Sequence, residues 1–140
     1  METLNVKLQS LDDKAMFSVN ARNNPPIIVD YFPPVGTEKG YTSLELLMAS
    51  FGSCISTTLV TILRYKMQKT VTGINTDVEG LVRDTHPKCL NQINVNLDIN
   101  SVDTTKEEVQ HALKLAEKDI CPVWAMIKGN VNIEITFTIQ

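Results

Sequence analysis

The segment from Ser43 to about Gln68 constrains the fold most, because it is predicted to form one long helix that is apolar on almost every side. The apolar residues that cover its directions are Leu46, Leu47, Met48, Phe51, Ile55, Leu59, Val60, Ile62 and Leu63. Such a helix has to be buried on several sides. Because serines and threonines interrupt the same window, its hydropathy is moderate, and we expect a buried core helix rather than a membrane span.

Both ends of this helix carry residues that are typical of helix ends. Thr42 or Ser43 can cap the N-terminus, and Glu45 places a negative charge in the first turn. The closing "RYKMQK" is basic, as suits the negative end of the helix dipole.

The remaining segments alternate between strand and helix patterns. Residues 5–11, 15–21 and 27–32 are predicted strands, followed after the long helix by strands at 74–84 and 91–100. Two helices at 104–120 and 121–129 and a strand at 130–140 close the chain. This order predicts a single α+β domain over residues 1–140.

Composition narrows the class of protein. The chain has 140 residues, of which 43% are hydrophobic and 21% charged, as in an ordinary globular domain. Its net charge of -3 is spread without runs, so we expect neither nucleic acid nor a membrane surface as a partner. The N-terminus lacks a secretory pattern, and three cysteines are an odd number for a disulfide scaffold. A reducing cytoplasm is the predicted compartment.

Cys121 gives the clearest local signal of chemistry. In "DICPVWAM" it precedes Pro122 at the expected start of a helix. Free backbone N–H groups and the helix dipole there favour a thiolate, although a cysteine packed at a helix start gives the same pattern.

Cys54 lies inside the apolar helix, among small hydroxyl side chains. Ser50, Thr57 and Thr58 are about one turn away, and Thr61 is one turn further. These hydroxyls either bond back to the preceding carbonyls or line a small polar cavity around the thiol. The sequence leaves both interpretations open.

A metal site is not predicted. The chain has no C-x-x-C pair, and "HPKC" is the one short-spaced motif among its cysteines and histidines. His111 falls on the polar side of its helix, and Cys89 has no evident partner.

In combination, three blocks resemble the OsmC/Ohr family of thiol-dependent peroxidases. "TSLELLMASFGSC" is similar to the family's helix that ends in a first cysteine. "LVRDTHPKCLNQINVNLDI", with Arg83, His86 and Pro87, resembles the strand pair of the OsmC-like branch. "VQHALKLAEKDICPVWAMI" resembles the segment that delivers a second cysteine, 67 residues after the first.

The resemblance implies an intertwined homodimer in which antiparallel sheets wrap around a long central apolar helix. It implies that Cys54 and Cys121 meet at the dimer interface. Cys54 would then reduce an organic hydroperoxide and become a sulfenic acid, and Cys121 would close a disulfide that an external dithiol reduces. This cycle needs no metal, flavin or haem, and it would serve oxidative or osmotic stress defence.

The resemblance also implies an arginine and a glutamate that hold Cys54 as a thiolate. The family's glutamate lies ten positions before the cysteine, where this chain has Leu44. Glu45 is nine positions away, on the opposite side of a straight helix, so it is either the catalytic carboxylate or a plain first-turn charge. Arg22, in the early turn, is the candidate arginine or an exposed turn residue, with Arg64 and Arg83 as reserves.

A second hypothesis comes from a different class of protein. The chain could keep the fold without catalysis and bind a small hydrophobic ligand in an apolar cavity near Cys54. The leucine at position 44 favours this alternative.

Overall fold

The computed structural model describes all residues from Met1 to Gln140. The chain divides into two compact units, Met1–Leu46 and Leu47–Gln140, and each is described by itself. The single domain predicted over residues 1–140 stays a prediction. The order of strands and helices along the chain agrees with the predicted order.

The first unit holds a small antiparallel sheet of three strands, β1 (Lys7–Ser10), β2 (Phe17–Asn20) and β3 (Ile27–Val29). The third strand is shorter than the predicted 27–32, because the buried carboxylate of Asp30 binds the chain that follows it. This carboxylate accepts hydrogen bonds from the backbone N–H groups of Tyr31, Thr37 and Lys39. These bonds fold the segment into a turn instead of a strand.

Helix α1 (Ser43–Thr61) starts where the sequence predicts. Thr42 and Glu45 form a capping box at its N-terminus: each side chain accepts the backbone N–H of the other residue. The helix then continues as a π-helical turn, Ile62–Lys66, and together the two make one helix long and apolar enough to cross a membrane by length and composition. Phe51, Ile55 and Leu59 are wholly buried, as expected of a core helix.

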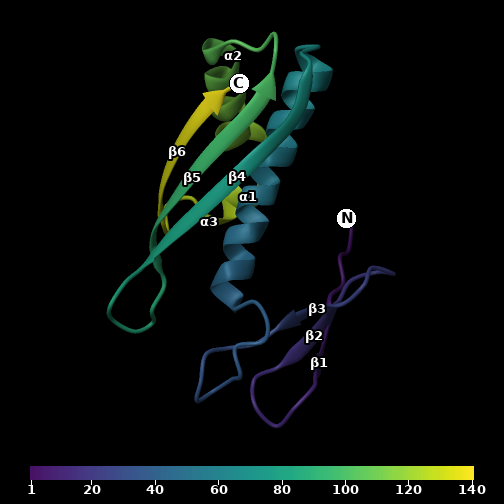
Figure 1. Cartoon of the computed structure of the whole chain (residues 1–140), viewed down its shortest axis with the longest axis vertical. Coiled ribbons are helices and arrows are strands. Elements are labelled where there is room, and N and C mark those ends of the chain that lie inside the picture. Colours follow the sequence, from purple (N-terminus) through teal and green to yellow (C-terminus); the bar gives the residue numbers. More distant parts are fainter. The chain divides into compact units, whose positions relative to one another are not determined.

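The second unit is built on a sheet of β4 (Val71–Val82), β5 (Leu90–Ser101) and β6 (Asn132–Ile139), in that order. The predicted alternation in β5 is confirmed, since its wholly or almost wholly buried residues are Ile93, Val95, Leu97 and Ile99. The helices of this unit lie on one face of the sheet (Figure 1). Helix α1 approaches β4 closely at Gly52, where a Cβ atom would lie 2.8 Å from Val78 Cγ2.

The expected antiparallel pairing is confirmed for β4 with β5 and is wrong for β6. β4 and β5 are antiparallel, but β6 runs parallel to β5, from Gln92 opposite Asn132 to Ile99 opposite Ile139. Parallel neighbours need a long crossover between them. Residues 102–131 provide it, and they contain both of the short helices.

The crossover starts with α2 (Lys106–Leu115), whose predicted capping box between Thr105 and Glu108 is confirmed. A π-helical turn, Ala116–Ile120, follows it and leads into α3 (Pro122–Ile127). Gly129, just beyond α3, has a φ of 88°, a conformation that glycine adopts without strain.

Candidate active site

Two sulfur atoms from distant parts of the chain lie side by side in the second unit. Sγ of Cys121 is 2.8 Å from Sγ of Cys54, although the residues are 67 positions apart. Both cysteines are free thiols. A disulfide joins sulfurs at about 2.05 Å, so the two sulfur atoms lie close to bonding distance.

The two thiols differ in their access to solvent. Cys54 is partly exposed on α1, whereas Cys121 is only 2% exposed. A reagent in solution can therefore reach Cys54 first, while Cys121 stays behind it as an internal partner.

Local backbone structure places Cys121. The π-helical turn before it ends in a hydrogen bond from the Cys121 N–H to the carbonyl of Ala116. Cys121 is the N-cap of α3, and Pro122 occupies the first turn as the sequence predicts.

The predicted preference of Cys121 for the thiolate is wrong for this pair of thiols. Burial raises the pKa of Cys121 to about 11, and the hydrogen bond to Cys54 raises it as well. The backbone N–H groups of Trp124 and Val123 lower this pKa, as expected at a helix start, but they do not overcome the effect of burial. Cys121 is thus held as the protonated thiol.

Two of the hydroxyls on α1 donate back to carbonyls of the same helix. Thr61 Oγ1 donates to the carbonyl of Thr57, and Ser56 Oγ donates to that of Gly52. Ser56 also hydrogen-bonds Thr76 on β4, at 2.6 Å. These contacts support bonding back to the helix as the role of the two hydroxyls.

An open pocket of about 320 Å³ lies beside this region, between α1 and β4. Its lining residues are Ala49, Gly52, Ser53, Ser56, Ile74, Asn75, Thr76 and Val78. It adjoins Cys54 in sequence through Ser53, but neither cysteine lines it.

Glu45 lies in the first unit, in the capping box at the start of α1. One carboxylate oxygen accepts the backbone N–H of Thr42 at 2.8 Å. This bond, with a further one from the Thr42 side chain, holds the pKa of Glu45 below its ordinary value. Glu45 is thus a charged N-terminal carboxylate, and its assistance to Cys54 stays a prediction.

The three arginines lie in different places. Arg22 is exposed in the β2–β3 turn of the first unit, with a φ of 56° that is uncommon outside glycine. In the second unit, Arg64 Nε donates to the carbonyl of Val71, and Arg83 Nε donates to that of Pro87. A role of Arg22 at Cys54 stays a prediction.

The other candidate ligands lie apart from each other. Cys89, His86 and His111 are exposed, the first two in the loop between β4 and β5 and the third on α2. No group of three or more His, Cys, Asp or Glu side chains is arranged to hold a metal ion.

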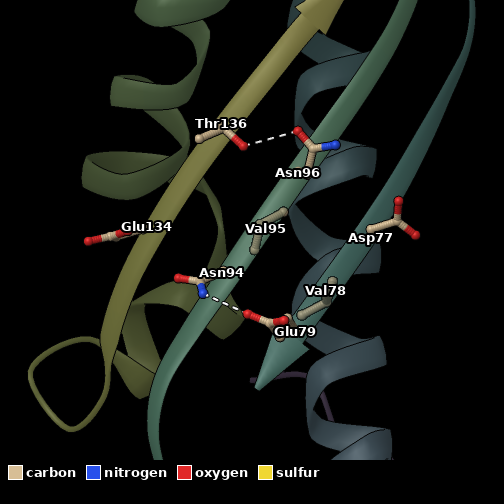
Figure 2. Close-up of a pocket in the computed structure, with 8 residues that line it drawn as sticks. All are labelled: Asp77, Val78, Glu79, Asn94, Val95, Asn96, Glu134 and Thr136. Carbon is tan, nitrogen blue, oxygen red and sulfur yellow. Dashed lines mark hydrogen bonds between the residues drawn. The ribbon is translucent and has the colours of Figure 1, made fainter. Parts of the chain in front are cut away.

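The outer face of the second sheet carries a groove of about 360 Å³ on the side away from the helices (Figure 2). Its polar side chains are partly paired with each other. Asn94 donates to Glu79 at 3.0 Å, and Thr136 donates to Asn96 at 3.0 Å. The groove is lined by no cysteine, so the thiol pair lies outside it.

Sequence reasoning missed an aromatic contact beside the thiols. Phe51 on α1 and Trp124 on α3 stand edge to face, with ring centroids 5.7 Å apart. Phe51 precedes Cys54 by three residues and Trp124 follows Cys121 by three. This symmetric spacing was the available signal, since residues three apart on a helix share a face.

The fold is shared with solved structures of other proteins. A crystal structure of a hypothetical protein from Aquifex aeolicus VF5 is similar over 100% of this chain and 98% of its own, with a TM-score of 0.85 and 28% identity. An OsmC-like protein from Mycoplasma pneumoniae reaches a TM-score of 0.82 at 20% identity, over 99% and 97% of the two chains.

A third similar structure is an organic hydroperoxide resistance protein OsmC from Legionella pneumophila. It has a TM-score of 0.71 at 14% identity, over 99% of this chain and 98% of its own. None of the curated proteins matches the sequence.

The family model of OsmC-like proteins matches residues 36–136. The match includes α1 with Cys54 and the crossover with Cys121. It also includes β4, β5 and the part of β6 up to Thr136. Because this match spans more than half of the sequence, the chain belongs to the family of OsmC-like proteins.

Proposed function

We propose that this protein is a thiol-dependent peroxidase that reduces organic hydroperoxides with Cys54 and Cys121. The observation that carries the proposal is the 2.8 Å separation of the two sulfurs, with one thiol partly exposed and the other buried. Family membership supports a role in redox or peroxide stress. A reducing cytoplasm, where a dithiol can restore the pair, is the proposed compartment.

The proposed cycle has three steps. The Cys54 thiolate attacks the terminal peroxide oxygen, the O–O bond breaks, and with one proton the alcohol leaves while Cys54 becomes a sulfenic acid. The Cys121 sulfur then attacks the Cys54 sulfur, and its proton leaves with the hydroxyl as water. An external dithiol reduces the resulting disulfide and is itself oxidised.

We also propose that two copies of the chain associate. Large apolar side chains stay exposed in the single chain: Leu47, Tyr65, Ile120 and Met126. A second copy that covered these side chains would remove their apolar surface from water. The second copy is the partner that the family resemblance implies, and sedimentation of the purified protein measures the association.

Thiol titration tests the peroxidase cycle. One equivalent of cumene hydroperoxide should remove two thiols per chain together. Cys54→Ser should abolish the loss. Cys121→Ser should instead leave a sulfenic acid on Cys54 that dimedone captures. Cys89→Ser is the matched control, because Cys89 is exposed and outside the pair, and it should behave like the parent.

An unchanged thiol count under hydroperoxide would overturn the peroxidase assignment. The alternative, a non-catalytic protein that binds a small hydrophobic ligand, is favoured by one observation: the carboxylate of Glu45 is already engaged in the capping box. In that case an apolar molecule should copurify with the protein while all three thiols persist.

A further inference from the structure

We propose that Phe51 and Trp124 are positioning residues whose contact holds the two thiols within bonding range. The inference rests on the proposed function, and it gives a role to two residues that take no part in the proposed cycle. Neither aromatic ring carries a reactive group. Their effect would come through the placement of Cys54 and Cys121.

The geometry places the aromatic contact next to the thiol contact. On α1, Phe51 lies one turn before Cys54, and on α3 Trp124 lies one turn after Cys121. Both connections therefore link the same two helices, through sulfur at 2.8 Å and through rings 5.7 Å apart at 79°. Edge-to-face pairs of this kind attract beyond the burial of their area.

The need for such a contact follows from the size of α3. It has six residues, fewer than a helix needs to be stable by itself, so packing has to fix its position. Trp124 is the buried residue of α3, at 7% exposure, and Phe51 is wholly buried. Cys121, at the start of α3, makes no capping bond with its side chain. The indole is thus what anchors the helix that begins at this cysteine.

The dithiol–disulfide equilibrium measures positioning without any hydroperoxide. In a glutathione buffer, the chain gives up two hydrogens as Cys54 and Cys121 join, and oxidised glutathione takes them up as two reduced molecules. The equilibrium constant reports how readily the sulfurs meet. Trp124→Ala or Phe51→Ala should lower it about tenfold, which equals a rise in potential of about 30 mV.

Three further variants separate positioning from loss of stability. Trp124→Phe, which keeps an aromatic ring, should restore most of the equilibrium constant. The double variant Phe51→Ala/Trp124→Ala should cost less than the sum of the single variants, because the rings act through each other. Leu63→Ala is the matched control: Leu63 is wholly buried on the same helix, about 13 Å beyond Cys54, and its loss should leave the constant unchanged.

All variants are compared at a temperature where circular dichroism shows them folded. An unchanged constant in Trp124→Ala, or an equal drop in Leu63→Ala, would overturn the positioning role. A failure to consume hydroperoxide counts against the peroxidase alone, because the glutathione equilibrium does not involve that reaction.

Discussion

In the first unit, β1 leaves all four of its residues exposed, whereas β5 in the second unit buries every second residue from Ile93 to Ile99. The first sheet has strands of three or four residues, while β4 and β5 have twelve each. Side-chain burial is the main source of stability. The comparison indicates that the second unit has its own core and that local hydrogen bonds, such as those to Asp30, order the first.

Hydrogen exchange should show the largest difference between the units. Amides of β5 exchange only when the core opens, whereas those of β1 to β3 need only local opening. We expect protection about ten-thousandfold greater in β5 than in β1, measured by mass spectrometry on the whole protein. Equal protection in the two sheets would show that the comparison is wrong.

Oxidation should increase the difference in stability between the second unit and the first. A Cys54–Cys121 disulfide closes a loop of 67 residues that lies wholly within the second unit. Loss of unfolded-chain entropy over such a loop stabilises the folded state by about 4 kcal/mol. The oxidised protein should unfold at a higher urea concentration than the reduced protein. Cys121→Ser should show no such dependence on the redox state, and a parent protein that also showed none would contradict the prediction.

Matched leucine truncations compare the two sheets directly. Leu97→Ala removes a wholly buried side chain from β5 and should cost about 3 kcal/mol of the free energy of unfolding. Leu8→Ala removes a side chain from β1 that is 59% exposed, and should change that energy by less than about 0.5 kcal/mol. Urea denaturation measures both. Similar losses would mean that β1 is covered in solution, for instance by a second copy.

Acid should affect the first unit through Asp30, with the smallest effect of the four. Hydrogen bonds from the Thr37 side chain and from backbone N–H groups lower the pKa of Asp30 to about 2, below an unfolded value of about 3.9. Its contribution to stability is therefore present above pH 4 and is lost as the pH falls from about 4 through 2.

Hydrogen exchange of residues 27–41 along that pH range, corrected for intrinsic rates, measures the loss. Asp30→Asn should show weaker protection at neutral pH and little further change toward pH 2. A parent protein whose protection there rises with acid would contradict the assigned direction.

Much of the fold could be predicted because its signals are local. The alternation in β5, the Thr105 capping box and the apolar helix from Ser43 each depend on residues near in sequence. The parallel pairing of β6 was not predictable, since it depends on the path of a crossover. The early end of β3 depends on how Asp30 folds back onto Thr37 and Lys39.

In the candidate site too, the local features could be predicted from the sequence and the long-range contacts could not. The helix start at Pro122 is local and was predicted. The pKa of Cys121 moved against that local signal, because burial is set by the packing of the whole unit. The proximity of the two sulfurs came from family resemblance alone, and the pairing of Phe51 with Trp124 came only from the structure.

The exposed loop of residues 83–89 lies between Cys54 and Cys121 in the sequence, so the effect of cutting it depends on whether these two cysteines are joined. In the oxidised protein, the segment from Cys54 to Cys121 becomes a closed covalent ring, and this loop is part of the ring. Trypsin cutting once after Lys88 would release two fragments from the reduced chain. The same cut in the oxidised chain would leave a single molecule, opened but still joined through sulfur.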